Sequence, residues 1–270
     1  MTIRSQETQS PVLNVPQVLK EFWRLPSLTV ARFTLVSYMR SGWILGDVVF
    51  VWLLYAIFFL EFGGNVAYFF GTAGQGLGVL AILGTVIMVQ RAMSARVYLL
   101  LSRLTSRSAY IRGLVIATGV MRVPLFLMLL LLAQSYHQFS PPSCDGIGRC
   151  IEGSTPGNMT IGSLGLLANC IVIATLIVTF SAPIATRRAR IIFLVWFAAV
   201  LYSNTSPGPV ATVLGVTRIP LIPLAICYNL GSAGSIDWSG AAALALVAGY
   251  VVGLTLLAEY WMRRRDLLLQ

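Results

Sequence analysis

The feature of this sequence that most constrains its fold is a series of apolar stretches, each about as long as a membrane is thick. A helix needs roughly 20 predominantly apolar residues to cross about 30 Å of hydrocarbon. Six stretches approach or exceed that length, namely 44–62, 72–90, 113–135, 161–182, 191–206 and 239–261. None shows the period-two alternation of a membrane-barrel strand. We therefore expect an all-α integral membrane protein with six transmembrane helices.

The charge distribution supports a membrane location and argues against a nucleic-acid partner. Only 10% of the residues are charged, against roughly 25% in soluble domains. The net charge of +10 would suggest nucleic-acid binding in a soluble protein, but here the arginines gather at the ends of the apolar stretches. That placement is typical of cytoplasmic segments of membrane proteins. We expect membrane lipids around the chain and a multi-pass location in the cell membrane, of the bacterial inner-membrane type.

The same charges predict the topology. If the N-terminus is cytoplasmic and residues 208–236 return to the side they left, 16 of the 19 lysines and arginines lie inside. If 208–236 crossed fully, the arginines at 263–265 would move outside, against the positive-inside rule. Pro209, Pro220 and Pro223 also interrupt a straight helix there. We expect both termini inside and a re-entrant helical segment at 208–236.

The chain divides accordingly into four parts. Ser27 follows Pro26 and can cap the start of a helix. We expect a cytoplasmic tail, an interfacial amphipathic helix, a six-helix transmembrane domain and a second cytoplasmic tail, with bounds of 1–26, 27–43, 44–261 and 262–270. Inside the transmembrane domain, 91–112 is a cytoplasmic loop and 136–160 is an outer loop.

Motifs for common catalytic sites are absent from the sequence. A phosphate-binding loop needs glycines that end in Lys-Ser or Lys-Thr, and the only lysine, Lys20, lies in a glycine-free stretch. A single histidine, His137, excludes the paired histidines of a metalloprotease and leaves no base for a serine hydrolase at membrane depth. We expect that the chain is not an enzyme by itself and that it carries no metal and no cofactor.

Two arginines lie at membrane depth, where a charge is costly and invites a functional hypothesis. Arg122 stands next to Pro124 inside 113–135, and Arg218 lies in 208–236. Both can line a cargo path for an anionic or zwitterionic head group. The simpler interpretation is an internal ion pair or a side chain that reaches to the interface. The acids near span ends are Asp47, Glu61, Asp237 and Glu259.

Two cysteines flank a short segment of the expected outer loop. Cys144 and Cys150 can form a disulfide if that loop faces an oxidising compartment. The sequence leaves open whether they do.

The segment 91–112 contains five arginines and no acid. Arginines and serines alternate with an apolar ridge of valine and leucine, and that combination is typical of a docking surface. The alternative is a plain positive-inside loop. The segment is longer than orientation alone requires.

A family resemblance rests on these residues. An interfacial helix with RFTL at 32–35 and YMRS at 38–41 precedes two spans, and YLLLSRLTSRSAY at 98–110 leads into the third. This order resembles the permease subunit of type-2 ABC exporters, in topology over nearly the whole chain and in motif over 28–115. Relatives often have proline where this chain has Leu104.

The resemblance implies an ATP-driven transport subunit. Separate ATPase subunits would bind ATP and dock on the 91–112 loop, and a second permease chain, identical or related, would complete the transporter. The docking residues it implies are Arg96, Tyr98, Leu101, Arg103, Ser106 and Arg107. The expected cargo is a lipid, a glycan, a peptide or a hydrophobic compound. Two alternatives remain open, an ion-coupled secondary transporter and a membrane scaffold or immunity protein that moves nothing.

Overall fold

The computed structural model describes residues 26–59, 65–92, 107–136, 155–182, 184–205 and 238–264. These residues form helices and no strands. The prediction of an all-α chain is therefore confirmed for this part of the sequence.

Four helices among the described residues are long and apolar enough to cross a membrane. They are α4 (Val66–Ala92), the continuous pair α6 (Arg107–Val120) and α7 (Arg122–Tyr136), α8 (Pro156–Thr179) and α12 (Trp238–Arg264). They correspond to the expected spans at 72–90, 113–135, 161–182 and 239–261. The architecture is thus compatible with a multi-pass membrane protein with four to five candidate spans.

The expected first span differs from the prediction. Helix α3 (Trp43–Phe58) follows α2 (Pro26–Met39) after a bend of 74°, and the pair meets the criteria for a span only when it is taken together. Gly42 permits the bend because its φ of 76° lies in the left-handed region, which favours glycine. Hydropathy suggested a separate span over 44–62, but α3 has only 16 residues and is about 24 Å long.

The expected fifth span corresponds to α9 (Arg187–Thr205). Among the described residues it is not one of the helices that meet the criteria for crossing a membrane. Three arginines in its first four residues make this end polar. Four to five candidate spans are therefore present in the described part of the chain, and the count of six stays a prediction.

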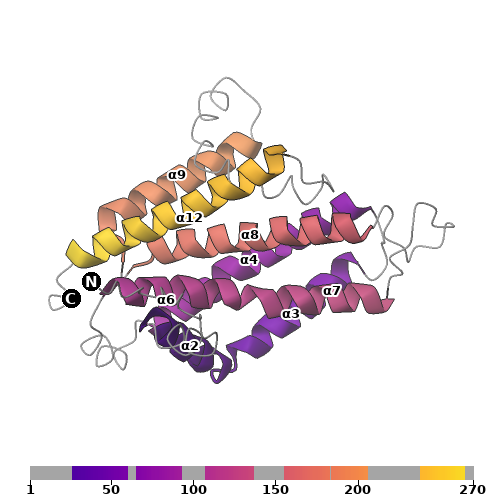
Figure 1. The fold of residues 1–270 in the computed structure, drawn as a ribbon, viewed down its shortest axis with the longest axis horizontal. Coiled ribbons are helices and arrows are strands. Elements are labelled where there is room, and N and C mark those ends of the chain that lie inside the picture. The colour runs from indigo at the N-terminus through magenta and orange to yellow at the C-terminus, as the bar shows by residue number, and fades with distance from the viewer. Residues whose placement is uncertain are drawn as a thin grey trace, which may run out of the picture.

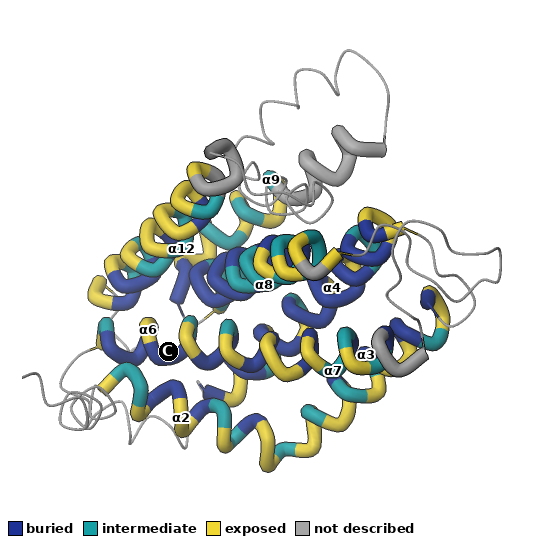
Figure 2. The backbone as a smooth tube through the Cα atoms, turned by 45° about the vertical axis from the view of Figure 1, so that its right-hand side comes forward, coloured by how far each residue is buried: buried dark blue, intermediate teal, exposed yellow. Residues whose placement is uncertain are grey.

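The helices lie in layers along the long axis of the molecule (Figure 1). Helices α9 and α12 form one side, α2, α3, α6 and α7 form the other, and α4 and α8 lie between them. Burial follows this order, since α4 and α8 are buried along much of their length while α2, α3 and α12 expose their outer sides (Figure 2). Large apolar side chains cover those outer sides, including Leu45, Trp52, Ile57, Val252 and Leu256. Such a surface suits contact with lipid.

Glycines let α4 approach three neighbours closely. A side chain at Gly76 would collide with Leu54 of α3, and one at Gly78 would lie 3.4 Å from Ile173 of α8. A third glycine, Gly84, faces Arg122. These glycines lie inside the apolar stretch 72–90, where small residues permit close helix packing.

Helix α2 packs along α6 through one stripe of residues. Val30, Ala31, Thr34 and Tyr38 are buried at helical spacing. Gly113 of α6 makes room for the backbone of α2, because a Cβ there would collide with the carbonyl oxygen of Ser27. The expected segment 27–43 therefore contains a helix, which ends at Met39, and a closely fitted contact holds it against α6. Its interfacial and amphipathic character stays a prediction.

Candidate functional site: the base of the 91–112 segment and the buried Arg122

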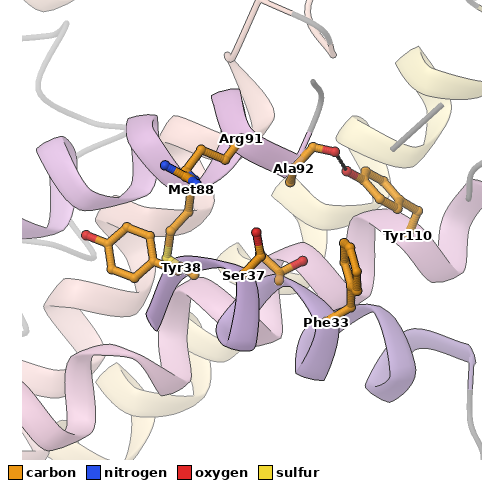
Figure 3. A pocket seen from close by; sticks show the side chains of 8 residues that line it. Phe33, Ser37, Tyr38, Met88, Arg91, Ala92 and Tyr110 are labelled. Atoms are coloured by element: carbon orange, nitrogen blue, oxygen red, sulfur yellow. Dashed lines mark hydrogen bonds between the residues drawn. The ribbon is translucent and has the colours of Figure 1, made fainter. Parts of the chain in front are cut away.

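The two flanks of the 91–112 segment are joined to each other. α4 ends at Ala92 and α6 begins at Arg107. The buried Tyr110 hydroxyl of α6 donates a hydrogen bond of 2.5 Å to the carbonyl oxygen of Ala92 (Figure 3). Because that carbonyl belongs to the last turn of α4, it has no partner within its own helix. The hydrogen bond thus supplies the missing partner and holds the two ends of the segment together.

Helix α2 closes against this base. Phe33, Ser37 and Tyr38 of α2 face Met88 and Arg91 of α4 across a narrow hollow (Figure 3). The hollow has a volume of about 10 Å³, which is about the space of one water molecule. Little room therefore separates α2 from the base of the segment.

Helix α12 is tied to the same base by an ion pair. Arg112 Nε lies 2.7 Å from Glu259 Oε1, and Arg112 Nη2 donates to Oε2 at 3.3 Å. Arg263 approaches the same carboxylate at 4.0 Å. Glu259, named from sequence only as an acid near a span end, therefore joins α12 to α6, 147 residues away in the chain.

Several of the described arginines lie at one end of the molecule. Arg91 lies in the last turn of α4, Arg112 pairs with α12, and Arg263 and Arg264 lie in the last turn of α12. Figure 1 shows the start of α6, the start of α9 and the end of α12 at that same end. Phe180, which lies between α8 and α9, contacts Trp261 near the end of α12 with ring centroids 5.6 Å apart. The charge count grouped these arginines on one side of a membrane, and their positions are consistent with that grouping.

A second polar site lies in the interior, where α2 bends into α3 and where α6 continues into α7. Tyr38, just before the bend between α2 and α3, donates a hydrogen bond of 2.8 Å to Asp47 Oδ2. Both side chains are buried. Arg122 begins α7 directly after Met121, and its charge attracts that of Asp47, although no ion-pair contact joins them. The site therefore places an acid and a base in the interior of the helix bundle.

Only one of the three guanidinium nitrogens of Arg122 has hydrogen-bond partners among the described residues. Arg122 is 2% exposed, so it does not reach the interface. Its Nη2 donates to Thr85 Oγ1 at 3.3 Å and approaches the Ala81 carbonyl oxygen at 3.5 Å. Its Nε and Nη1 have no hydrogen-bond partner among the described residues. A buried guanidinium in this state is costly. No carboxylate among the described residues forms an ion pair with it, and two of the acids near span ends, Glu61 and Asp237, lie outside the described part.

Gly84 shapes the space for this guanidinium. A Cβ at Gly84 would lie 2.8 Å from Arg122 Nη2 and 2.9 Å from Nη1. Sequence reasoning missed Tyr38, Gly84 and Thr85 as members of this site. No periodic pattern connects them to Arg122, because they come from α2 and α4 and Arg122 comes from α7.

Most other predicted site residues lie outside the described part of the chain. Of the docking residues, Arg107 is described, and it is exposed at the first position of α6. The remainder are Arg96, Tyr98, Leu101, Arg103 and Ser106, together with Arg218, Cys144 and Cys150. The re-entrant segment at 208–236 also lies outside, as do most of the outer loop and both expected tails.

Comparison with known proteins gives no match. No protein-family model, no curated protein and no solved structure matches this chain.

Proposed function

We propose that the chain is the permease subunit of an ATP-driven ABC transporter and exports a lipid, a glycan, a peptide or a hydrophobic compound. Separate ATPase subunits dock on the 91–112 segment, and a second permease chain completes the transporter. The arginine-rich end faces the cytoplasm, in keeping with the positive-inside rule.

One observation carries this proposal: the base of the 91–112 segment is bound to helices on several sides. Tyr110 joins α6 to α4, and Arg112 joins α6 to α12. Helix α2 packs against α6 and closes over the same base. A displacement of the segment by an ATPase would therefore act on α2, α4, α6 and α12 together. A loop that only set orientation would not need such a base.

The experiment is co-purification with an ATP-binding cassette protein encoded next to this chain. We expect a stable complex whose ATP turnover falls when Arg103 or Arg107 is replaced by glutamate. Arg40→Glu is the matched control, because Arg40 is also exposed but lies beyond the end of α2. Normal ATP turnover with both loop variants, or no complex at all, would contradict the proposal.

A second candidate function is an ion-coupled carrier that acts alone. The interior acid and base, Asp47 and Arg122, favour it, because ionisable residues inside a helix bundle often mark proton or ion pathways. The chain alone, reconstituted into vesicles, would then move substrate under an ion gradient without ATP. Under this candidate, Asp47→Asn would abolish the gradient-driven transport, whereas under the first candidate transport would require ATP and the partner subunits.

A further inference from the structure

A cavity that has no part in the proposed transport function lies between α4, the end of α8 and the start of α9. Its volume is about 240 Å³. Its wall includes the apolar side chains of Val86 of α4, Ile177 of α8, and Phe193 and Leu194 of α9, and its uncharged polar members are Gln90 and Ser181. The wall is thus largely hydrocarbon, and the cavity can take several methylene groups.

One charged side chain enters this apolar wall. Arg190 lines the cavity, and its Nε atom is buried without a hydrogen-bond partner among the described residues. A buried donor without a partner is costly. A ligand that brings an acceptor atom to this position would remove that cost.

The start of α9 adds positive charge at the same place. Arg187, Arg188 and Arg190 occupy three of its first four positions, and its first turn contains no acid. A helix N-terminus already carries a partial positive charge, so cations there are unfavourable and an anion is favourable. The backbone N–H groups in the first turn of a helix have no acceptor within the helix. One of them, that of Ala189, donates to Thr186 Oγ1 at 3.2 Å. The local charge therefore lacks a compensating anion within the described residues.

The position along the bundle matches the level of lipid head groups. Phe180, a wall residue, stacks on Phe193 with ring centroids 4.3 Å apart and contacts Trp261 edge to face. Trp261 is followed by Arg263 and Arg264 at the arginine-rich end. Tryptophan and arginine gather at membrane interfaces, where phosphates of anionic lipids lie.

We propose that this cavity binds an anionic phospholipid, with one acyl chain between α4 and α9 and the phosphate at Arg190 and the N-terminus of α9. The ligand needs both an acyl chain and a phosphate, because the wall of the cavity is apolar and its mouth is cationic. The bound lipid is a resident ligand of this chain. The inference goes beyond the transport function and does not depend on it.

Native mass spectrometry of the full chain in detergent tests the proposal, with phosphatidylglycerol as probe. Phosphatidylcholine with the same acyl chains and soluble glycerol 3-phosphate serve as comparison ligands. We expect Arg190→Gln to weaken phosphatidylglycerol binding about tenfold, as is typical when one charge-assisted hydrogen bond is lost. Val86→Trp should weaken it similarly, because the indole fills the cavity. Arg32→Gln and Val79→Trp are matched controls on exposed positions of α2 and α4, and we expect no change.

Two outcomes would overturn the proposal. Equal binding of phosphatidylcholine, with no effect of Arg190→Gln, would reduce the cavity to an apolar crevice. Binding of glycerol 3-phosphate as strongly as the lipid, with no effect of Val86→Trp, would leave a simple anion site. If Val86→Trp fails to fold, Leu194→Glu takes its place. Leu194 is 63% exposed, and a carboxylate there would repel the phosphate, so unchanged lipid binding by this variant would likewise contradict the proposal.

Discussion

Arg112 and Glu259 form an ion pair whose two members are unequally buried. The side chain of Glu259 is 5% exposed and that of Arg112 is 56% exposed. Removal of the arginine leaves a carboxylate in the interior that, within the described part of the chain, has Arg263 as its remaining cation, at 4.0 Å. Removal of the acid leaves an arginine that water can reach.

We therefore predict an asymmetry between the two single variants. Arg112→Gln should lower the free energy of unfolding by about 1–3 kcal/mol, since a buried charged acceptor loses its partner. Glu259→Gln should lower it by less than about 1 kcal/mol, as for an exposed pair. Thermal unfolding in detergent measures both, and the double variant should resemble Glu259→Gln. Equal losses in the two single variants would show that the burial difference has no energetic consequence.

The contact of Gly113 with α2 gives a second prediction. Gly113→Ala should destabilise the protein by about 1–3 kcal/mol, because the added methyl group meets the Ser27 carbonyl oxygen and Val30. Gly119→Ala is the matched control on the same helix, since its Cβ would lie 3.6 Å from Ile171, an ordinary contact. Thermal unfolding of the two variants provides the comparison. If both melt alike, α2 is not packed against α6 as described.

Replacement of Arg122 separates stability from function. Arg122→Met should leave stability unchanged or raised, because an apolar chain of similar length replaces a buried charge whose Nε and Nη1 have no partner among the described residues. If Arg122 serves transport, the same variant should lose transport while its unfolding temperature is kept. A fall in stability by several kcal/mol would instead assign Arg122 a structural role.

Gly84→Ala tests the contact between Gly84 and the Arg122 guanidinium. In the parent chain it should cost about 1–3 kcal/mol, since the new Cβ meets the guanidinium of Arg122. Combined with Arg122→Met the cost should fall, because the thioether is flexible and can move aside. A double-mutant cycle measures this coupling, and additive effects would contradict the contact.

The sequence predicted the long helices and a boundary between 27–43 and 44–62, but not the angle at that boundary. Length and apolar content are enough to find α4, α6 with α7, α8 and α12, because each alone exceeds the thickness of the hydrocarbon. Such sums contain no angles, so they gave a span of 44–62 that is longer than α3 and did not indicate that α2 and α3 form one bent pair. The glycine that permits the bend, Gly42, is visible in the sequence, but a glycine after a serine does not by itself specify a turn of 74°.

The sequence grouped several arginines on one side of the membrane, but it did not indicate which residues contact them. Charge placement grouped the arginines at one end, since the positive-inside rule acts on each segment independently. The partners of Arg112 and Tyr110 lie 147 and 18 residues away in the chain, and no local pattern encodes such distances. For Arg122 the sequence indicated the cost of burial, but the absence of an ion pair within the described part of the chain depends on how three helices pack around it.

The bend between α2 and α3 has a consequence for how the chain is built into a membrane. These two helices precede all other described helices in synthesis, and α3 alone is shorter than the hydrocarbon is thick. It also carries Asp47, whose hydrogen bond comes from Tyr38 on the other side of the bend. The pair packs against α4 and also against α6 and α7, which are made only after α4. Stable insertion of the N-terminal pair must therefore wait for helices that the ribosome has not yet released.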